Sequence, residues 1–203
     1  MASSFFSKAR TEALADGIFA TVMTILVLSL VVPTITGSTG SAGLEAYLYG
    51  LLPDLFAYVI TFIFLGVIWI GHQSSLSHIT RIDRTILWVN LLQLMGVGLI
   101  PFATALLGRY PMQPLAVVTY GLNGLAATAL YSVIWYYAKL KHLTHEEPSP
   151  EVATYRNKIV FVAPIVYAFA IGFAYVSVYV SLALFAGVTV FYIAFGENMF
   201  TKG

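Results

Sequence analysis

The chain has 203 residues, of which 59% are hydrophobic and only 9% are charged. A soluble domain devotes about 25% of its residues to charge, so this chain could not coat a water-facing surface and is predicted to be an integral membrane protein. Its net charge of +1 gives no indication of nucleic-acid binding, and the absence of cysteine excludes disulfides and thiolate metal sites.

The apolar runs are continuous rather than alternating, which predicts membrane-spanning helices and an all-α fold. An uncharged run covers residues 159–195 and would measure about 55 Å as one helix, nearly twice the bilayer core, so it is divided in two. We therefore expect one transmembrane domain over residues 1–203, with helices at about 10–32, 46–75, 85–107, 115–138, 159–175 and 178–197.

The first helix begins with Arg10, Glu12 and Asp16 and then runs without charge to Val32, just before Pro33. A charge at bilayer depth is costly and normally faces protein or water, so these residues mark a functional or packing site. A loop of Gly, Ser and Thr follows at 34–43.

Further along the chain, Pro101 should kink the third helix because proline cannot donate a backbone hydrogen bond. The turn at 109–114 is short. Residues 139–158 form the one clearly soluble stretch, and we expect them to be a loop.

Basic residues fall almost entirely on one side of a six-span arrangement, which predicts that both termini are cytoplasmic. Arg109 alone lies on the other side. The cytoplasmic set comprises Lys8, Arg10, Arg81, Arg84, Lys139, Lys141, Arg156, Lys158 and Lys202.

Signatures of an enzyme are missing from the sequence. His72 and His78 are six residues apart, whereas a helical metal pair needs a spacing of four. His142, His145 and Glu146 could approach one ion but lie in the polar loop. There is no nucleophile elbow or glycine-rich phosphate loop, so we expect no catalytic residue, no cofactor and no resident metal.

The remaining polar residues gather at one depth, near the cytoplasmic ends of the first three helices. Two interpretations stay open: a hydrogen-bond network that fixes helix packing, which we favour, or a relay for protons or ions. The residues concerned are Arg10, Glu12, Asp16, Trp69, His72, Asp83, Arg84, Asn90 and Gln93.

One face of the first helix carries small residues, then hydroxyls, then aliphatic side chains. Its members are Ala13, Gly17, Thr21, Thr24, Ile25 and Leu28. The face could be a helix–helix seam. Alternatively, copies of it could surround a narrow conduit with a hydrophobic neck, which would favour potassium because potassium loses its water more cheaply than sodium.

The sequence Arg10-x-x-x-Leu14-Ala15-Asp16, followed by an apolar helix, resembles the R-x-x-x-F-S-D signature of the transmembrane protein 175 potassium channels. A second region that resembles the family comprises Trp69-Ile70-Gly71-His72, Asp83, Asn90-Leu91-Leu92 and Pro101-Phe102-x-Thr104. Together the two regions cover about the first half of the chain.

The resemblance implies a homotetramer in which the first helix of each copy lines a central pore closed by bulky aliphatic residues. Pore positions would be Thr21, Thr24 or Ile25, and Leu28. It also implies that Arg10, Asp16, His72 and Asp83 belong to a polar packing network.

Two departures from the family pattern are evident. Leu14-Ala15 replaces Phe-Ser, and Thr21 stands where isoleucine or leucine is usual, so we expect weaker gating and an altered potassium preference. The function expected is a potassium-preferring cation leak channel in a prokaryotic inner membrane, whose partners are potassium ions, the lipid bilayer and copies of itself. The alternatives are a proton-coupled secondary transporter and a non-conducting membrane scaffold.

Overall fold

The computed structural model describes residues 7–31, 40–145 and 149–195. These residues contain six helical segments that are long and apolar enough to cross a membrane. They are Lys8–Ser29, Gly43–His78, Arg84–Arg109, Pro114–Leu140, Pro150–Phe173 and Val178–Phe195. The all-α fold and the six spans predicted from the sequence are confirmed.

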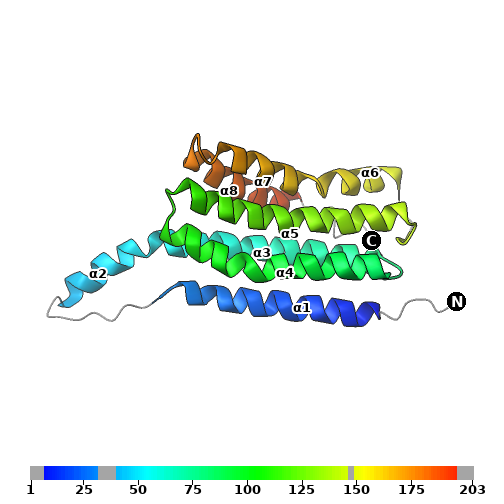
Figure 1. Ribbon diagram of the computed structural model, residues 1–203, viewed down its shortest axis with the longest axis horizontal. Coiled ribbons are helices and arrows are strands. Elements are labelled where there is room, and N and C mark those ends of the chain that lie inside the picture. Colours follow the sequence, from blue (N-terminus) through cyan, green and yellow to red (C-terminus); the bar gives the residue numbers. More distant parts are fainter. Residues whose placement is uncertain (1–6, 32–39, 146–148, 196–203) are drawn as a thin grey trace.

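The spans form a bundle of long helices, with α1 along one edge (Figure 1). Helix α1 packs on α3 and α4, while α5 lies between α4 and α7, and α8 packs on α7 and α3. The elements are α1 Lys8–Ile25, the 3₁₀ turn η1 Leu26–Ser29, α2 Gly40–Gly50, α3 Leu52–His78, α4 Arg84–Arg109, α5 Pro114–Leu140, α6 Pro150–Ile159, α7 Val162–Phe173 and α8 Val178–Phe195.

Several boundaries differ from those expected. The first helix ends at Ser29 rather than at 32. The second is interrupted at Leu51, two residues before Pro53, and its outer part α2 reaches back into the expected 34–43 loop. Helix α4 continues through Pro101. Residues 32–39 and 196–203 lie outside the described residues, and so do the expected helix ends at 32 and 197, Glu146 and Lys202.

The polar stretch 139–158 is not the simple loop expected from its charge, because it contains α6. The Ser149 side chain accepts a hydrogen bond from the Val152 N–H at 3.3 Å, and Pro150 is the first helical residue. A serine cap followed by proline is a strong helix start, since proline supplies the helical φ where no N–H donor is needed. Charge alone was a poor guide here.

Close packing of α5 against α7 depends on Gly124. A Cβ added there would lie 2.7 Å from the ring carbon Cζ of Tyr167, which is fully buried and stacks on Phe185 with ring centroids 5.0 Å apart. Neither ring can move without displacing the centre of the bundle. The missing side chain is therefore what lets the two helices approach.

We expect Gly124→Ala to destabilise the fold by about 1–3 kcal/mol through overpacking. The matched control is Gly98→Ala, because an added Cβ at Gly98 meets nothing within 4 Å. That control should be neutral, or stabilising by up to about 1 kcal/mol through helix propensity. Thermal unfolding of the purified protein in one detergent compares the two, and equal midpoints would contradict the close-packing argument.

The ends of the bundle differ in charge. The start of α1, the end of α3, the start of α4 and the end of α5 meet at one end, and Lys8 Nζ donates to the Ser77 carbonyl across 3.0 Å there. Arg109 lies at the end of α4, and thus at the opposite end of the bundle. The structure therefore brings the basic residues of these helices together at one end, as the sequence tally predicts.

Candidate functional site

Helix α1 has one face against the bundle and one face away from it. The buried face comprises Thr11, Ala15, Phe19, Val22 and the η1 residue Leu26. On the opposite side the predicted stripe of Thr21, Thr24, Ile25 and Leu28 is exposed, with Ile25 45% and Leu28 71% accessible. The stripe is therefore not a seam within this chain, because no other described part of the chain covers it.

The two threonine hydroxyls on this face both donate their hydrogen bonds to backbone carbonyls of α1. Thr21 Oγ1 donates to the Gly17 carbonyl at 2.7 Å, and Thr24 Oγ1 donates to the Thr21 carbonyl at 2.8 Å. A hydroxyl has one donor and two acceptor lone pairs, so each oxygen keeps acceptor capacity. Chemically, the exposed face can accept hydrogen bonds from water or coordinate a cation, and it becomes purely aliphatic toward Leu28.

Asp16 connects α1 to α3. Its Oδ1 atom accepts a hydrogen bond from Trp69 Nε1 at 2.9 Å and another from Gln73 Nε2. Trp69 and Gln73 are one helical turn apart and thus share a face of α3. The sequence analysis placed Asp16 and Trp69 in one polar group without pairing them, and it did not include Gln73.

A second polar contact connects α3 to α4. His72 Nε2 lies 2.7 Å from Asn90 Oδ1, and both residues are buried. The Phe19 ring of α1 covers this pair, with its centroid 5.7 Å from that of His72. The pair therefore lies beneath the buried face of α1 and away from the exposed stripe.

Asp83 makes a third connection, between α4 and α5. Its Oδ1 accepts from the Ile86 N–H at 2.8 Å and caps α4, while its Oδ2 accepts from the Tyr137 hydroxyl at 2.7 Å. Arg10 is exposed and forms no ion pair with Asp16 within the described residues. The predicted network is thus divided into separate contacts that join successive helices, and no hydrogen bond among the described residues links one contact to the next.

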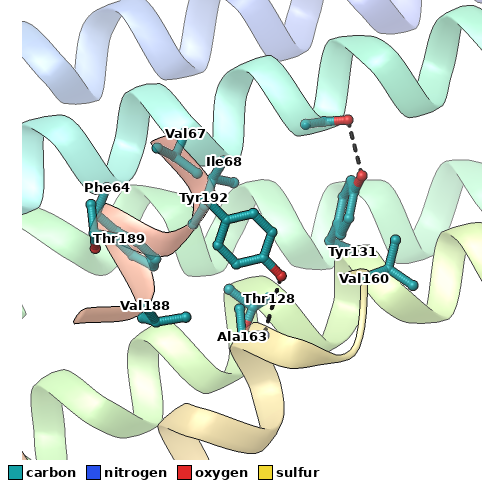
Figure 2. A pocket seen from close by; sticks show the side chains of 11 residues that line it. Phe64, Val67, Ile68, Thr128, Tyr131, Val160, Ala163, Val188, Thr189 and Tyr192 are labelled. Atoms are coloured by element: carbon teal, nitrogen blue, oxygen red, sulfur yellow. Dashed lines mark hydrogen bonds between the residues drawn. The ribbon is translucent and has the colours of Figure 1, made fainter. Parts of the chain in front are cut away.

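A small cavity of about 40 Å³ lies on the other side of the bundle, between α3, α5, α7 and α8 (Figure 2). Its lining is almost entirely apolar, and the hydroxyls of Tyr131 and Tyr192 on its wall are bonded to backbone carbonyls of Gly71 and Ile159. The described residues contain no group of three or more His, Asp or Glu side chains that could hold a metal. The exposed face of α1 combines two threonine oxygens with an aliphatic end, and it is the candidate functional surface.

Known proteins are similar to this chain over most of its length. A family model described as the endosomal/lysosomal potassium channel TMEM175 matches residues 10–101. A protein of Chamaesiphon minutus that is named a potassium channel is 31% identical over 180 residues, covering 86% of this chain and 88% of the relative. A protein of Streptomyces collinus with the same description is 29% identical over 188 residues, covering 90% of each chain.

The fold is similar to a solved structure as well. The crystal structure described as a lysosomal potassium-selective channel TMEM175 homolog from Chamaesiphon minutus matches with a TM-score of 0.82 and 27% identity, covering 92% of this chain and 96% of the other. The family match begins at Arg10 and includes the first region that carries the resemblance, and the second region as far as Pro101. On these grounds the chain belongs to the TMEM175 family.

Proposed function

We propose that this protein is a potassium-preferring cation leak channel, formed by four copies of the chain around a pore lined by α1. Its relatives from Chamaesiphon minutus and Streptomyces collinus are named potassium channels. The observation that carries the proposal to particular residues is the exposed α1 stripe. A stripe with a glycine and two hydroxyls is poorly matched to lipid tails and suits water or another copy of the same helix.

In this arrangement the threonine oxygens face the conduit on the cytoplasmic side, and Ile25 and Leu28 form a hydrophobic neck beyond them. Such a neck gates by dewetting, so an ion must lose water to pass. Potassium holds its water less tightly than sodium and therefore crosses more easily. By the positive-inside rule the basic end of the bundle faces the cytoplasm. The bacterial relatives named potassium channels support a location in the inner membrane of a prokaryote.

The three polar contacts at Asp16, His72 and Asp83 support the pore helix rather than carry ions. The Asp16 contact holds α1 on α3, while the contacts at His72 and Asp83 hold α3 to α4 and α4 to α5, the helices against which α1 is positioned. A buried hydrogen-bonded pair is costly to break because it leaves one partner unsatisfied. Their contribution is therefore to the position of α1 and its exposed face.

Ion flux from proteoliposomes tests the function. Vesicles are loaded with potassium and then, separately, with sodium, and no proton gradient is imposed. The proposal expects a passive leak that is faster for potassium. Absence of flux in both salts, from protein shown to be folded and tetrameric, would instead favour a scaffold. Flux that needs an imposed proton gradient and is lost in Asp16→Asn would favour a transporter.

Thr21 offers a direct test of the pore face. We expect Thr21→Ile to lower the potassium leak severalfold, because an extra aliphatic ring of side chains lengthens the neck that must dewet. The matched control is Thr119→Ile on α5, where the threonine makes the same kind of bond to its own helix, to the Leu115 carbonyl at 2.8 Å. Equal leak rates for the two variants would show that Thr21 does not line the pore.

A further inference from the structure

The membrane span Pro150–Phe173 is broken between α6 and α7, at Val160 and Phe161. Pro164 explains one of the two helical hydrogen bonds that are missing at this break. In a continuous helix the N–H of residue 164 would donate to the Val160 carbonyl, and proline has no N–H. Ser132 of α5 supplies the missing donor, since its Oγ atom donates to the Val160 carbonyl at 2.5 Å.

Tyr192 of α8 accounts for the second missing hydrogen bond, which is the one between Ala163 and Ile159. Its hydroxyl accepts a hydrogen bond from the Ala163 N–H at 3.2 Å and donates to the Ile159 carbonyl at 2.6 Å. In a continuous helix Ala163 would donate directly to Ile159. The tyrosine hydroxyl is therefore inserted into the backbone ladder, and Figure 2 shows the ring of Tyr192 directed at Ala163 from across the cavity.

The two side-chain hydroxyls replace backbone hydrogen-bond partners in a buried region, where an unsatisfied backbone group would be most costly. Ile159 is 3%, Val160 2% and Ala163 7% exposed. Non-helical backbone at membrane depth is tolerated only where protein satisfies its polar groups. The helical hydrogen bond to the Val160 carbonyl can never form, because Pro164 has no N–H. The bond from the Ala163 N–H to the Ile159 carbonyl could form if the Tyr192 hydroxyl moved out from between them. The cavity beside the Tyr192 ring provides space for that movement.

Side-chain contacts hold α6 to α5 and α8, and the Tyr155 hydroxyl donates to the Phe195 carbonyl at the end of α8 across 2.8 Å. Trp135 Nε1 of α5 donates to Asn157 Oδ1 at 2.9 Å, and the Arg156 guanidinium lies over the Trp135 ring, 5.5 Å from its centroid. The main backbone contacts of α6 are with α7 alone, and most of its other residues are exposed. A change of angle at the break would therefore move α6 without disturbing the helices that surround α1.

We propose that Val160 and Phe161 form a two-state hinge controlled by the hydroxyl of Tyr192. In the bent state, which is the one described above, the hydroxyl separates Ala163 from Ile159. In the straighter state the ring withdraws toward the cavity, Ala163 donates to Ile159, and α6 swings away from Trp135. The Ala163 N–H and the Ile159 carbonyl keep a partner in both states, whereas the Tyr192 hydroxyl gives up both of its bonds in the straighter state, so the bent state is the more populated one.

The test measures the position of α6 with a pair of spin labels. The chain contains no cysteine, so Thr154→Cys on the exposed side of α6 and Leu140→Cys at the end of α5 label it specifically. Labelled chains are diluted with unlabelled ones in lipid nanodiscs, so that only distances within one chain are recorded. The parent pair should show two distances, with the shorter one dominant.

Tyr192→Phe removes the inserted hydroxyl and keeps the ring. We expect it to raise the population of the longer distance about threefold to tenfold, the range that corresponds to losing the net effect of about one hydrogen bond. The matched control is Tyr120→Phe, which removes a buried tyrosine hydroxyl that lies 3.1 Å from Thr61 Oγ1, between α5 and α3 and away from α6. That control should leave the populations unchanged.

A second variant keeps the test decisive if Tyr192→Phe folds poorly. Pro164→Ala restores a donor for the Val160 carbonyl and should also increase the longer distance. A single distance that neither variant changes would overturn the hinge. So would faster amide exchange at Ala163 in Tyr192→Phe with α6 in place, because Tyr192 would then only fill a fixed break. Neither readout depends on ion conduction, so the hinge and the proposed channel can fail separately.

Discussion

Replacing Leu28 with alanine should raise the passive potassium leak about tenfold or more and reduce the preference for potassium over sodium. Leu28 is 71% exposed at the aliphatic end of the α1 stripe, where the proposed neck is narrowest. Shortening the side chain in every copy widens the neck and lets water remain beside the ion, which lowers the dehydration cost. A tenfold change corresponds to about 1.4 kcal/mol of barrier.

The effect can be separated from a general loss of stability. Because Leu28 makes little contact within its own chain, Leu28→Ala should leave the unfolding midpoint nearly unchanged. Leu122→Ala is the matched control, since Leu122 is 53% exposed on α5, a helix that does not pack against α1. Flux and unfolding are measured on both variants. Unchanged conductance and selectivity in Leu28→Ala would show that the barrier lies elsewhere, and Ile25→Ala would then be the next variant.

From the helical repeat of 3.6 residues the sequence predicted a stripe along α1 and left open whether that stripe is a helix–helix seam or a pore face. That period separates Thr21 and Ile25 from Phe19, and the structure leaves the first two exposed and buries the third. Leu28 lies in the 3₁₀ turn η1, where the period differs, and is exposed as well. The same α-helical geometry explains why Arg10 and Asp16, although both belong to the predicted polar group, form no ion pair within the described residues. Six residues along a helix amount to about 600° of rotation, so the two side chains point roughly 120° apart.

Features that depend on distant segments could not be read from the sequence. Gln73 stands in a polar run at the end of α3, where a glutamine is usually solvated, and only the position of α1 shows that it meets Asp16. Pro164 was visible as a site for a kink. However, the groups that complete the break come from Ser132 and Tyr192, on other helices. Hydrogen-bond partners between helices follow from packing, which no local pattern records.

Removing the carboxylate of Asp16 should have the largest effect on the assembly of the site. Asp16→Ala deprives Trp69 Nε1 and Gln73 Nε2 of their common acceptor, and hydrogen bonds to a charged group contribute about 1.5–3 kcal/mol each. We expect a loss of roughly 2–5 kcal/mol in stability and, with α1 no longer fixed on α3, a loss of potassium-selective flux. Thermal unfolding and vesicle flux measure the two effects on one preparation.

Two comparisons show whether the hydrogen bonds or the charge of Asp16 matter. Asp16→Asn keeps an acceptor oxygen, so it should retain much of the stability and passive flux that Asp16→Ala loses. Glu12→Gln is the control on the same helix, because the ion pair of Glu12 with Lys8 spans 3.8 Å at the surface and contributes about 0–1 kcal/mol.

A double-mutant cycle with Gln73→Ala tests the contact itself. If Asp16 positions α1 through Gln73, the combined loss should be smaller than the sum of the single losses by about 0.5–3 kcal/mol. Additive losses would mean that the two residues act independently. Asp16→Asn also separates the two roles left open for this carboxylate: a positioning residue leaves potassium flux independent of a proton gradient, whereas in a proton carrier Asp16→Asn would abolish gradient-driven flux while the protein stayed folded.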